Sequence, residues 1–422
     1  MIYRLVVKKM LDKRPTEQQT FLWNMIGSGI YSLSSMILSL FVIKIVGAEQ
    51  GGIFSIALTL SQMLVYIAYF EMRTFQVTDS KNEFGFSEYH GTKIILCVLM
   101  MLFSCGYTLV QGYELEKTVI IILVCLARCL DGYADVYEAH FQKEERLDLA
   151  GKSLAYRTIL FVSVLLVSLL LSKELILSLI LADFIAVIGL LVFDMQVMQG
   201  LSGITCMWKI EKIKKIVIAC FPLFVGTFCW TYILSASRMA IDGNMASEYQ
   251  SYYQVIFMPV SVINLFAGFV FRPMLPKLAE NYNLKKYKLF TQLIMKGVLG
   301  IGVITIVCML GAWVLGIPVL SLMSGCNLSL YRGILVFLIF AGGFNAIAFT
   351  MYYVLTIMRC TKSILIDYVL AALLALGISQ PMVVKYGIQG AAWSYFIVVL
   401  ALCFLFCVSI GYKAILNKKG RI

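Results

Sequence analysis

Long uninterrupted apolar stretches dominate this sequence, for example residues 51–72, 289–312 and 389–412. Crossing the hydrocarbon core of a bilayer takes about 20 residues of α-helix, and each stretch is long enough. Since lipid offers no hydrogen bonds to an unpaired backbone, only helices and closed barrels span it, and barrel strands alternate apolar with polar residues. The stretches here are continuous and only 14% of the residues are charged. They therefore predict transmembrane helices rather than a soluble fold.

Twelve stretches meet this length requirement, which predicts an all-α membrane protein with about twelve transmembrane helices. The fourth, seventh and tenth carry more polar residues than the others. The twelve expected spans are 21–46, 51–72, 91–112, 117–140, 151–171, 174–198, 214–240, 250–273, 289–312, 331–357, 361–381 and 389–412.

The two halves of the chain have the same layout, which predicts two pseudo-symmetric six-helix lobes. The second span ends Phe70-Glu71-Met72-Arg73 and the eighth ends Val270-Phe271-Arg272-Pro273. In such parallel repeats the substrate path lies between the lobes, near the middle of the membrane. The longest break in the apolar pattern marks the lobe boundary. The expected parts are an N-terminal segment 1–20, an N-lobe 21–198, a linker 199–213, a C-lobe 214–412 and a tail 413–422.

The distribution of Lys and Arg predicts the orientation in the membrane. These residues concentrate in the termini and in the connections that follow even-numbered spans. Because basic residues near helix ends resist translocation, both termini are expected in the cytoplasm. The formal charge of +12 follows from this bias and from attraction to anionic lipids, so no nucleic-acid partner is expected.

The fourth span carries a stripe of polar residues on one helical face, because they recur at steps of three or four. The stripe comprises Arg128, Asp131, Asp135, Glu138 and Gln142. Ionisable groups are costly in lipid, so this face is expected to point into the protein. The stripe could line a path for a coupling cation or proton. The favoured alternative is an internally paired network with Arg157 of the fifth span and Asp183 of the sixth, since such charges neutralise one another.

Basic residues elsewhere could give the cavity between the lobes a positive lining. Such a lining would suit a pyrophosphate, whose geometry matches arginine well. The alternative for each residue is an anchor that reaches the membrane surface. The residues concerned are Lys44, Arg73, Arg238, Arg272 and Lys296.

Neutral polar residues within the spans suit sugar hydroxyls, although such groups also serve close helix packing. They include Asn24, Gln62, Asn264 and Asn345. Pro259 lies inside the eighth span, where its missing N–H predicts a bend and allows a hinge.

Motifs for catalysis, metals and cofactors are not found in the sequence. There is no GxxxxGK[ST] run for nucleotide phosphates. The two histidines, His90 and His140, lie near expected cytoplasmic ends, and the cysteines fall mostly inside apolar spans, where they act as small hydrophobes. We therefore expect no enzyme activity, no metal and no cofactor.

Three short segments carry a resemblance to a known family. They are the turn Val46-Gly47-Ala48-Glu49-Gln50-Gly51-Gly52-Ile53-Phe54-Ser55, the segment Gln142-Lys143-Glu144-Glu145-Arg146, and Arg272-Pro273. Together with the span layout, they resemble the polysaccharide-transporter branch of the multidrug/oligosaccharidyl-lipid/polysaccharide exporter superfamily, which includes O-antigen and capsule repeat-unit flippases. The resemblance implies two six-helix lobes around a cavity. It also implies that lipid-linked oligosaccharides move to the outer leaflet by alternating access.

Relatives that flip the peptidoglycan precursor place several arginines in the first two spans, and this sequence matches them only at Arg73. The sequence hypothesis is therefore a flippase for a variable oligosaccharide on undecaprenyl pyrophosphate, in a bacterial plasma membrane. Its partners would be membrane lipids, a polysaccharide polymerase and glycosyltransferases. The nearest alternative is a cation-coupled multidrug exporter that uses Asp131, Asp135 and Glu138. A membrane-embedded glycan polymerase is less favoured, because no large external loop is present to hold its active site.

Overall fold

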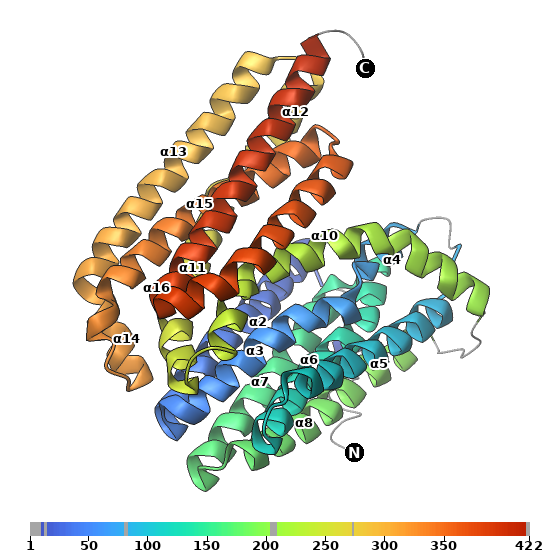
Figure 1. Ribbon diagram of the computed structural model, residues 1–422. Coiled ribbons are helices and arrows are strands. Elements are labelled where there is room, and N and C mark those ends of the chain that lie inside the picture. The colour runs from blue at the N-terminus through green and yellow to red at the C-terminus, as the bar shows by residue number, and fades with distance from the viewer. Residues whose placement is uncertain (1–9, 12–14, 80–82, 203–208, 272–273, 419–422) are drawn as a thin grey trace. The chain divides into compact units, whose positions relative to one another are not determined.

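The computed structural model describes residues 10–11, 15–79, 83–202, 209–271 and 274–418. These residues are almost entirely helical, and none of them lies in a strand. Their contacts divide the chain into two compact units, Met1–Phe228 and Cys229–Ile422, which we call unit 1 and unit 2. Both units are bundles of long helices (Figure 1).

Unit 1 contains the first six spans. Its helices are α2 (Glu17–Val46), α3 (Ala48–Tyr69), α4 (Met72–Thr78), α5 (Phe86–Gln111), α6 (Leu115–Lys143), α7 (Leu147–Ser172), α8 (Leu175–Leu190), the π-helical η1 (Leu191–Met195), α9 (Gln196–Ser202) and the first part of α10 (Ile210–Asp242). Helix α2 begins before its apolar stretch because Thr16 and Gln19 form a reciprocal capping box.

Two glycines let α2 and α7 approach each other closely. A Cβ atom on Gly27 would lie 2.3 Å from the carbonyl oxygen of Gly151, and one on Gly151 would lie 2.4 Å from the carbonyl oxygen of Trp23. Small residues at helix contacts are the usual means of tight packing in membranes. Helix α7 also packs on α6, so this contact holds the fifth span against the polar stripe.

A sharp break separates α3 from α4. Phe70 and Glu71 both adopt the left-handed conformation, with φ of 49° and 52°. This conformation costs an L-residue about 1–2 kcal/mol. The expected second span, 51–72, therefore ends as a helix at Tyr69, and Arg73 lies in the separate helix α4.

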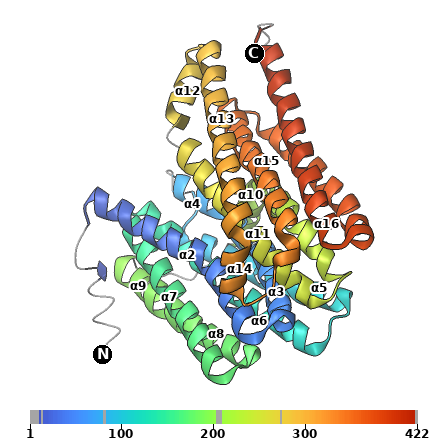
Figure 2. The same ribbon diagram turned by 90° about the vertical axis from the view of Figure 1, so that its left-hand side faces the viewer.

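Unit 2 contains the remaining spans. Its helices are the second part of α10, α11 (Ser247–Phe271), α12 (Leu275–Asn283), α13 (Tyr287–Gly311), the π-helical η3 (Ala312–Gly316), α14 (Ile317–Ser324), the 3₁₀ turn η4 (Ser329–Tyr331), α15 (Arg332–Ile357) and α16 (Thr361–Lys418). Helix α15 packs against α11, α13 and α16 (Figure 2). Helix α16 breaks at Gly387, whose φ of 58° and ψ of −137° suit only glycine. The break divides it into the two expected spans.

The prediction of about twelve spans is confirmed within the described residues. Nine helices or continuous helical stretches are long and apolar enough to cross a membrane. Helices α6 and α11, together with the second half of α16, complete the twelve. The ninth span is longer than expected and continues through η3 to Ser324, and the short helix α12 was not predicted.

The units divide at Phe228, inside α10, and not at the expected linker 199–213. The reason is that the first part of α10 packs into unit 1. Ile216 and Cys220 are buried in the same core cluster as Phe70, and the ring of Phe224 stacks on Phe70 with centroids 4.4 Å apart. Residues 203–208 of the expected linker lie outside the described residues.

Candidate functional site

The acidic residues of the α6 stripe pair with basic residues from neighbouring helices. Asp135 lies 3.3 Å from Nη1 of Arg73 and 2.9 Å from Nζ of Lys93. Glu138 lies 3.0 Å from Nη1 of Arg73 and also pairs with Nη2 of Arg157. Arg73 donates further to Oε1 of Gln142 at 3.2 Å. The stripe therefore faces the interior of unit 1, as predicted.

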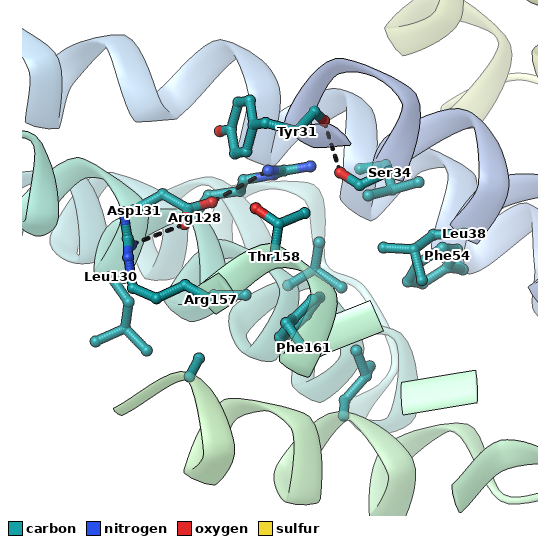
Figure 3. Close-up of a pocket in the computed structure, with 15 residues that line it drawn as sticks. Tyr31, Ser34, Leu38, Phe54, Arg128, Leu130, Asp131, Arg157, Thr158 and Phe161 are labelled. Carbon is teal, nitrogen blue, oxygen red and sulfur yellow. Dashed lines mark hydrogen bonds and ion pairs between the residues drawn. The ribbon is translucent and has the colours of Figure 1, made fainter. Parts of the chain in front are cut away.

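Asp131 completes this network one turn earlier on α6. Its carboxylate oxygens lie 3.1 Å from Nη1 of Arg128 and 3.4 Å from Nη1 of Arg157. Figure 3 shows the two arginines approaching Asp131 from α6 and α7. Nη2 of Arg128 also donates to Oγ of Ser35 at 2.7 Å, which ties α2 to the network. The stripe is therefore an internally paired network of charges. Its partner Arg157 is the one that the sequence predicted.

Asp183, the other predicted partner, does not join the network. It is buried on α8, and neither of its carboxylate oxygens has a hydrogen-bond partner in the structure. Its place is taken by Asp194 of η1, which lies 2.9 Å from Nε of Arg157 and accepts a hydrogen bond from Ser153. Helix α8 passes Arg157 at Gly189. Asp183 lies about 9 Å along the helix axis from Gly189, so its carboxylate cannot reach the guanidinium of Arg157.

Lys93 is a member of the network that the sequence reasoning missed. Its side chain is fully buried, and its ammonium donates to the carbonyl oxygens of Ala68 and Tyr69 at 3.1 and 3.4 Å as well as to Asp135. The last carbonyl groups of a helix have no partner within it. Lys93 therefore caps α3 at its break with α4. The available signal was a lysine inside the expected span 91–112, near its start.

A cavity of about 300 Å³ opens beside the network. It is lined by Tyr31, Tyr69, Glu71, Arg73, Thr74, Asp131, Asp135, Glu138 and Leu154. A smaller pocket of about 40 Å³, large enough for roughly one or two waters, adjoins Arg128, Asp131 and Arg157 (Figure 3). Glu71 lines the larger cavity and accepts a hydrogen bond from Oγ1 of Thr227 at 3.0 Å. No basic residue among those described forms an ion pair with Glu71.

The predicted basic residues occupy three different environments. Arg73 is neutralised by Asp135 and Glu138, so it is not a free positive charge. Lys44 on α2 and Lys296 on α13 are exposed. Arg272 lies outside the described residues. Arg238 is the exceptional member of this group.

Arg238 is buried on α10 in unit 2, with 8% of its surface exposed. Its guanidinium donates to Oε1 of Gln254 and to the carbonyl oxygen of Leu234, both at 3.3 Å, and lies 5.0 Å from the ring centre of Phe257. Its Nε has no hydrogen-bond partner. Among the described residues no carboxylate forms an ion pair with it. The described part of unit 2 thus buries a positive charge that no carboxylate pairs with.

Comparisons with known proteins agree with this architecture. No family model matches the sequence. The capsular polysaccharide biosynthesis protein CapF of Staphylococcus aureus is 22% identical over 310 residues, which make up 73% of this chain and 77% of that protein.

Solved structures of transporters superpose on nearly the whole chain. The lipid II flippase MurJ, in an inward closed conformation, has a TM-score of 0.73 at 14% identity, covering 93% of this chain and 87% of MurJ. An inward-facing multidrug resistance transporter of the MATE family, in the MOP superfamily, has a TM-score of 0.62 at 12% identity, covering 99% of each chain. The chain shares the fold of these transporter structures. The fold is the one that the sequence resemblance implied. With its long apolar helices, it makes the chain a multi-pass membrane protein.

Two of the predicted neutral polar residues meet inside unit 2. Nδ2 of Asn345 on α15 donates to Oδ1 of Asn264 on α11 at 3.0 Å. Asn24 and Gln62 are half-buried in unit 1, and neither contributes a hydrogen bond to the network. Helix α11 runs without interruption through Pro259, so the hinge at this residue stays a prediction.

Among the described residues, no three His, Cys, Asp or Glu side chains converge as a metal site would require. His90 lies among tyrosines instead, with its Nε2 2.6 Å from the hydroxyl of Tyr133.

Proposed function

We propose that this chain is a flippase that moves an oligosaccharide carried on undecaprenyl pyrophosphate across a bacterial plasma membrane, for cell-surface polysaccharide assembly. The fold shared with the flippase MurJ and the likeness to a capsule biosynthesis protein support this proposal. Alternating access between two lobes, with both termini in the cytoplasm, forms part of it. The glycosyltransferases that build the substrate and the polymerase that consumes its product would be its partners.

Arg238 is the observation that carries the proposal. A buried charge without a partner costs several kcal/mol, and an anion bound beside it offsets that cost. Its free Nε–H is a donor available to a phosphate oxygen, and arginine binds phosphate through parallel hydrogen bonds. The arginines of the unit 1 network are already committed to carboxylates. A pyrophosphate group is therefore expected to bind at Arg238 and not at Arg73.

The test is complementation of a strain that lacks the chromosomal gene, with surface polysaccharide as the readout. We expect Arg238→Gln, at normal protein level, to lower surface polysaccharide at least tenfold and to leave lipid-linked oligosaccharide in the inner leaflet. Arg238→Lys should restore part of the output, because it keeps the charge. Arg332→Gln, which removes an exposed arginine at the start of α15, is the control and should behave as wild type. Full output from Arg238→Gln would contradict the proposal.

A drug exporter is the second function to be tested, because the fold is shared with a multidrug resistance transporter. The acids that it would use, Asp131, Asp135 and Glu138, are each paired with basic residues, which argues against their taking up a free cation. The same deletion strain separates the two functions. Loss of drug resistance with an intact surface polysaccharide would favour the exporter.

A further inference from the structure

The charges around the unit 1 cavity do not balance. Counting the residues that line the cavity and their ion-pair partners, five carboxylates face four basic groups. The carboxylates are those of Glu71, Asp131, Asp135, Glu138 and Asp194, and the basic groups are those of Arg73, Lys93, Arg128 and Arg157. Four of the carboxylates are ion-paired and Glu71 is not. The excess negative charge therefore belongs to Glu71.

The backbone places Glu71 at the cavity wall. It occupies the break between α3 and α4, and its side chain is held by a single hydrogen bond from Thr227. Lys93, which caps the end of α3, donates to Asp135 and to the carbonyl oxygens of Ala68 and Tyr69. Lys93 attracts the Glu71 carboxylate through space, but no basic group among the described residues forms an ion pair with it.

The rest of the lining suits a cation that also carries apolar or hydroxyl groups. Tyr31 and Tyr69 contribute aromatic rings, with their hydroxyls 3.3 Å apart, and Thr74 adds a further hydroxyl. The two rings already lie near cations of the protein, the Tyr31 ring 5.1 Å from the Arg128 guanidinium and the Tyr69 ring 5.9 Å from Nζ of Lys93. Aromatic rings attract ammonium groups, most strongly where water is excluded. A volume of about 300 Å³ lies at the lower end of the range for small-molecule sites, about 300–1,000 Å³.

An anion would be rejected by this cavity. Its wall presents four carboxylates, and the basic group that lines it, Arg73, is shared between Asp135 and Glu138. A phosphate or a sugar acid would therefore meet net repulsion. An ammonium group would instead supply the charge that the wall lacks.

We propose that the unit 1 cavity binds an organic ammonium group and that Glu71 is the carboxylate that receives it. The group could belong to an amino sugar of the lipid-linked glycan, an assignment that rests on the proposed function, or to a free cationic compound. In either case the ligand is an amine with its positive charge retained.

Binding to the purified full chain in detergent tests the proposal. The probes are a glucosamine disaccharide, its N-acetylated counterpart, tetramethylammonium and sodium chloride, each measured by calorimetry or ligand-observed NMR. We expect the glucosamine disaccharide to bind at least tenfold more tightly than the neutral N-acetylated sugar. Glu71→Gln should weaken the binding of the glucosamine disaccharide at least tenfold. Glu174→Gln, an exposed acid before α8, is the matched control and should bind as wild type.

The second variant, Glu71→Asn, guards against loss of folding. Asparagine tolerates the left-handed conformation better than most residues, so this variant should keep the wild-type melting temperature and still lose affinity. Three results would overturn the proposal. They are equal binding of the charged and the neutral sugar, displacement of the amine by sodium at matched concentration, and no binding of either amine.

The outcomes also distinguish the two sources of the amine, and they test the ammonium site separately from the proposed flippase function. Tighter binding of tetramethylammonium than of the glucosamine disaccharide favours a free cation as the ligand and still supports the ammonium site. Amine binding together with normal surface polysaccharide in the deletion strain rejects the flippase and leaves the site standing. Lost polysaccharide without amine binding rejects the site alone.

Discussion

At the scale of single residues, Lys93 shows how a buried charge organises unit 1. Its ammonium joins the end of α3 to Asp135 and is completely shielded from solvent. We predict that Lys93→Met lowers the stability of the purified chain by about 3–5 kcal/mol, because it leaves a buried carboxylate with one partner fewer. Thermal unfolding followed by tryptophan fluorescence measures this loss.

The double variant Lys93→Met with Asp135→Asn controls for the lost packing of the lysine side chain. It should recover part of the loss, since the carboxylate is removed together with its partner. A single variant that melts at the wild-type temperature would show that Lys93 does not stabilise the break between α3 and α4.

Asp79, outside the membrane-spanning segments, makes stability depend on pH. Burial opposes its negative charge, but N–H groups of Phe84 and Glu83 and the ammonium of Lys143 outweigh that effect and hold its pKa below the ordinary value of 3.8. A lowered pKa in the folded state contributes stability above the ordinary pKa, and this contribution disappears as the pH falls through the folded value. Asp79 is therefore expected to stabilise the chain at neutral pH.

We predict that Asp79→Asn lowers the free energy of unfolding by about 1 kcal/mol at neutral pH, because its hydrogen bonds are weakened. The difference in melting temperature between wild type and Asp79→Asn should stay constant from about pH 7 to pH 5 and shrink below about pH 4. Melting curves of both proteins across this range provide the measurement. A difference that shrinks between pH 7 and pH 5 would mean that another group is responsible.

At the scale of helices, the contact between α2 and α7 depends on the absence of side chains at Gly27 and Gly151. We predict that Gly151→Ala destabilises the chain by about 1–3 kcal/mol, because the new methyl group would overlap the backbone of α2. Thermal unfolding is again the readout. Gly106→Ala on α5 is the matched control, since nothing lies within 4 Å of its added Cβ. The control should be neutral or slightly stabilising, because alanine favours a helix over glycine.

At the scale of the whole molecule, the distribution of basic residues predicts the orientation of every span. We predict that alkaline phosphatase fused after Gly112 or Lys173, in expected outer turns, is active, because the enzyme works only when exported. Fusions after Lys285 or Arg359, in expected cytoplasmic connections, should be inactive and stably expressed. Activity in the second set of fusions and not in the first would show that the chain has the opposite orientation, which would also reverse the direction of the proposed transport.

Much of the fold follows from the sequence alone because lipid imposes a simple requirement. Each span needs about 20 apolar residues, so twelve stretches predict twelve helices. The polar stripe on α6 was equally readable, since residues three or four apart share a helical face. Arg157 was predicted as its partner, and the structure places it there.

The partners across helices were decided by tertiary structure. Asp183 and Asp194 are both acids of the sixth span, and only the π-helical segment η1 and the crossing at Gly189 bring Asp194 to Arg157. Likewise Glu71 lines a cavity because α3 breaks at Phe70, and Arg73 lost its predicted role as a free cation because Asp135 and Glu138 lie within reach. Helical periodicity is local and can be read from spacing. Which charges meet depends on helix rotation and on breaks, which the packing of the whole unit sets.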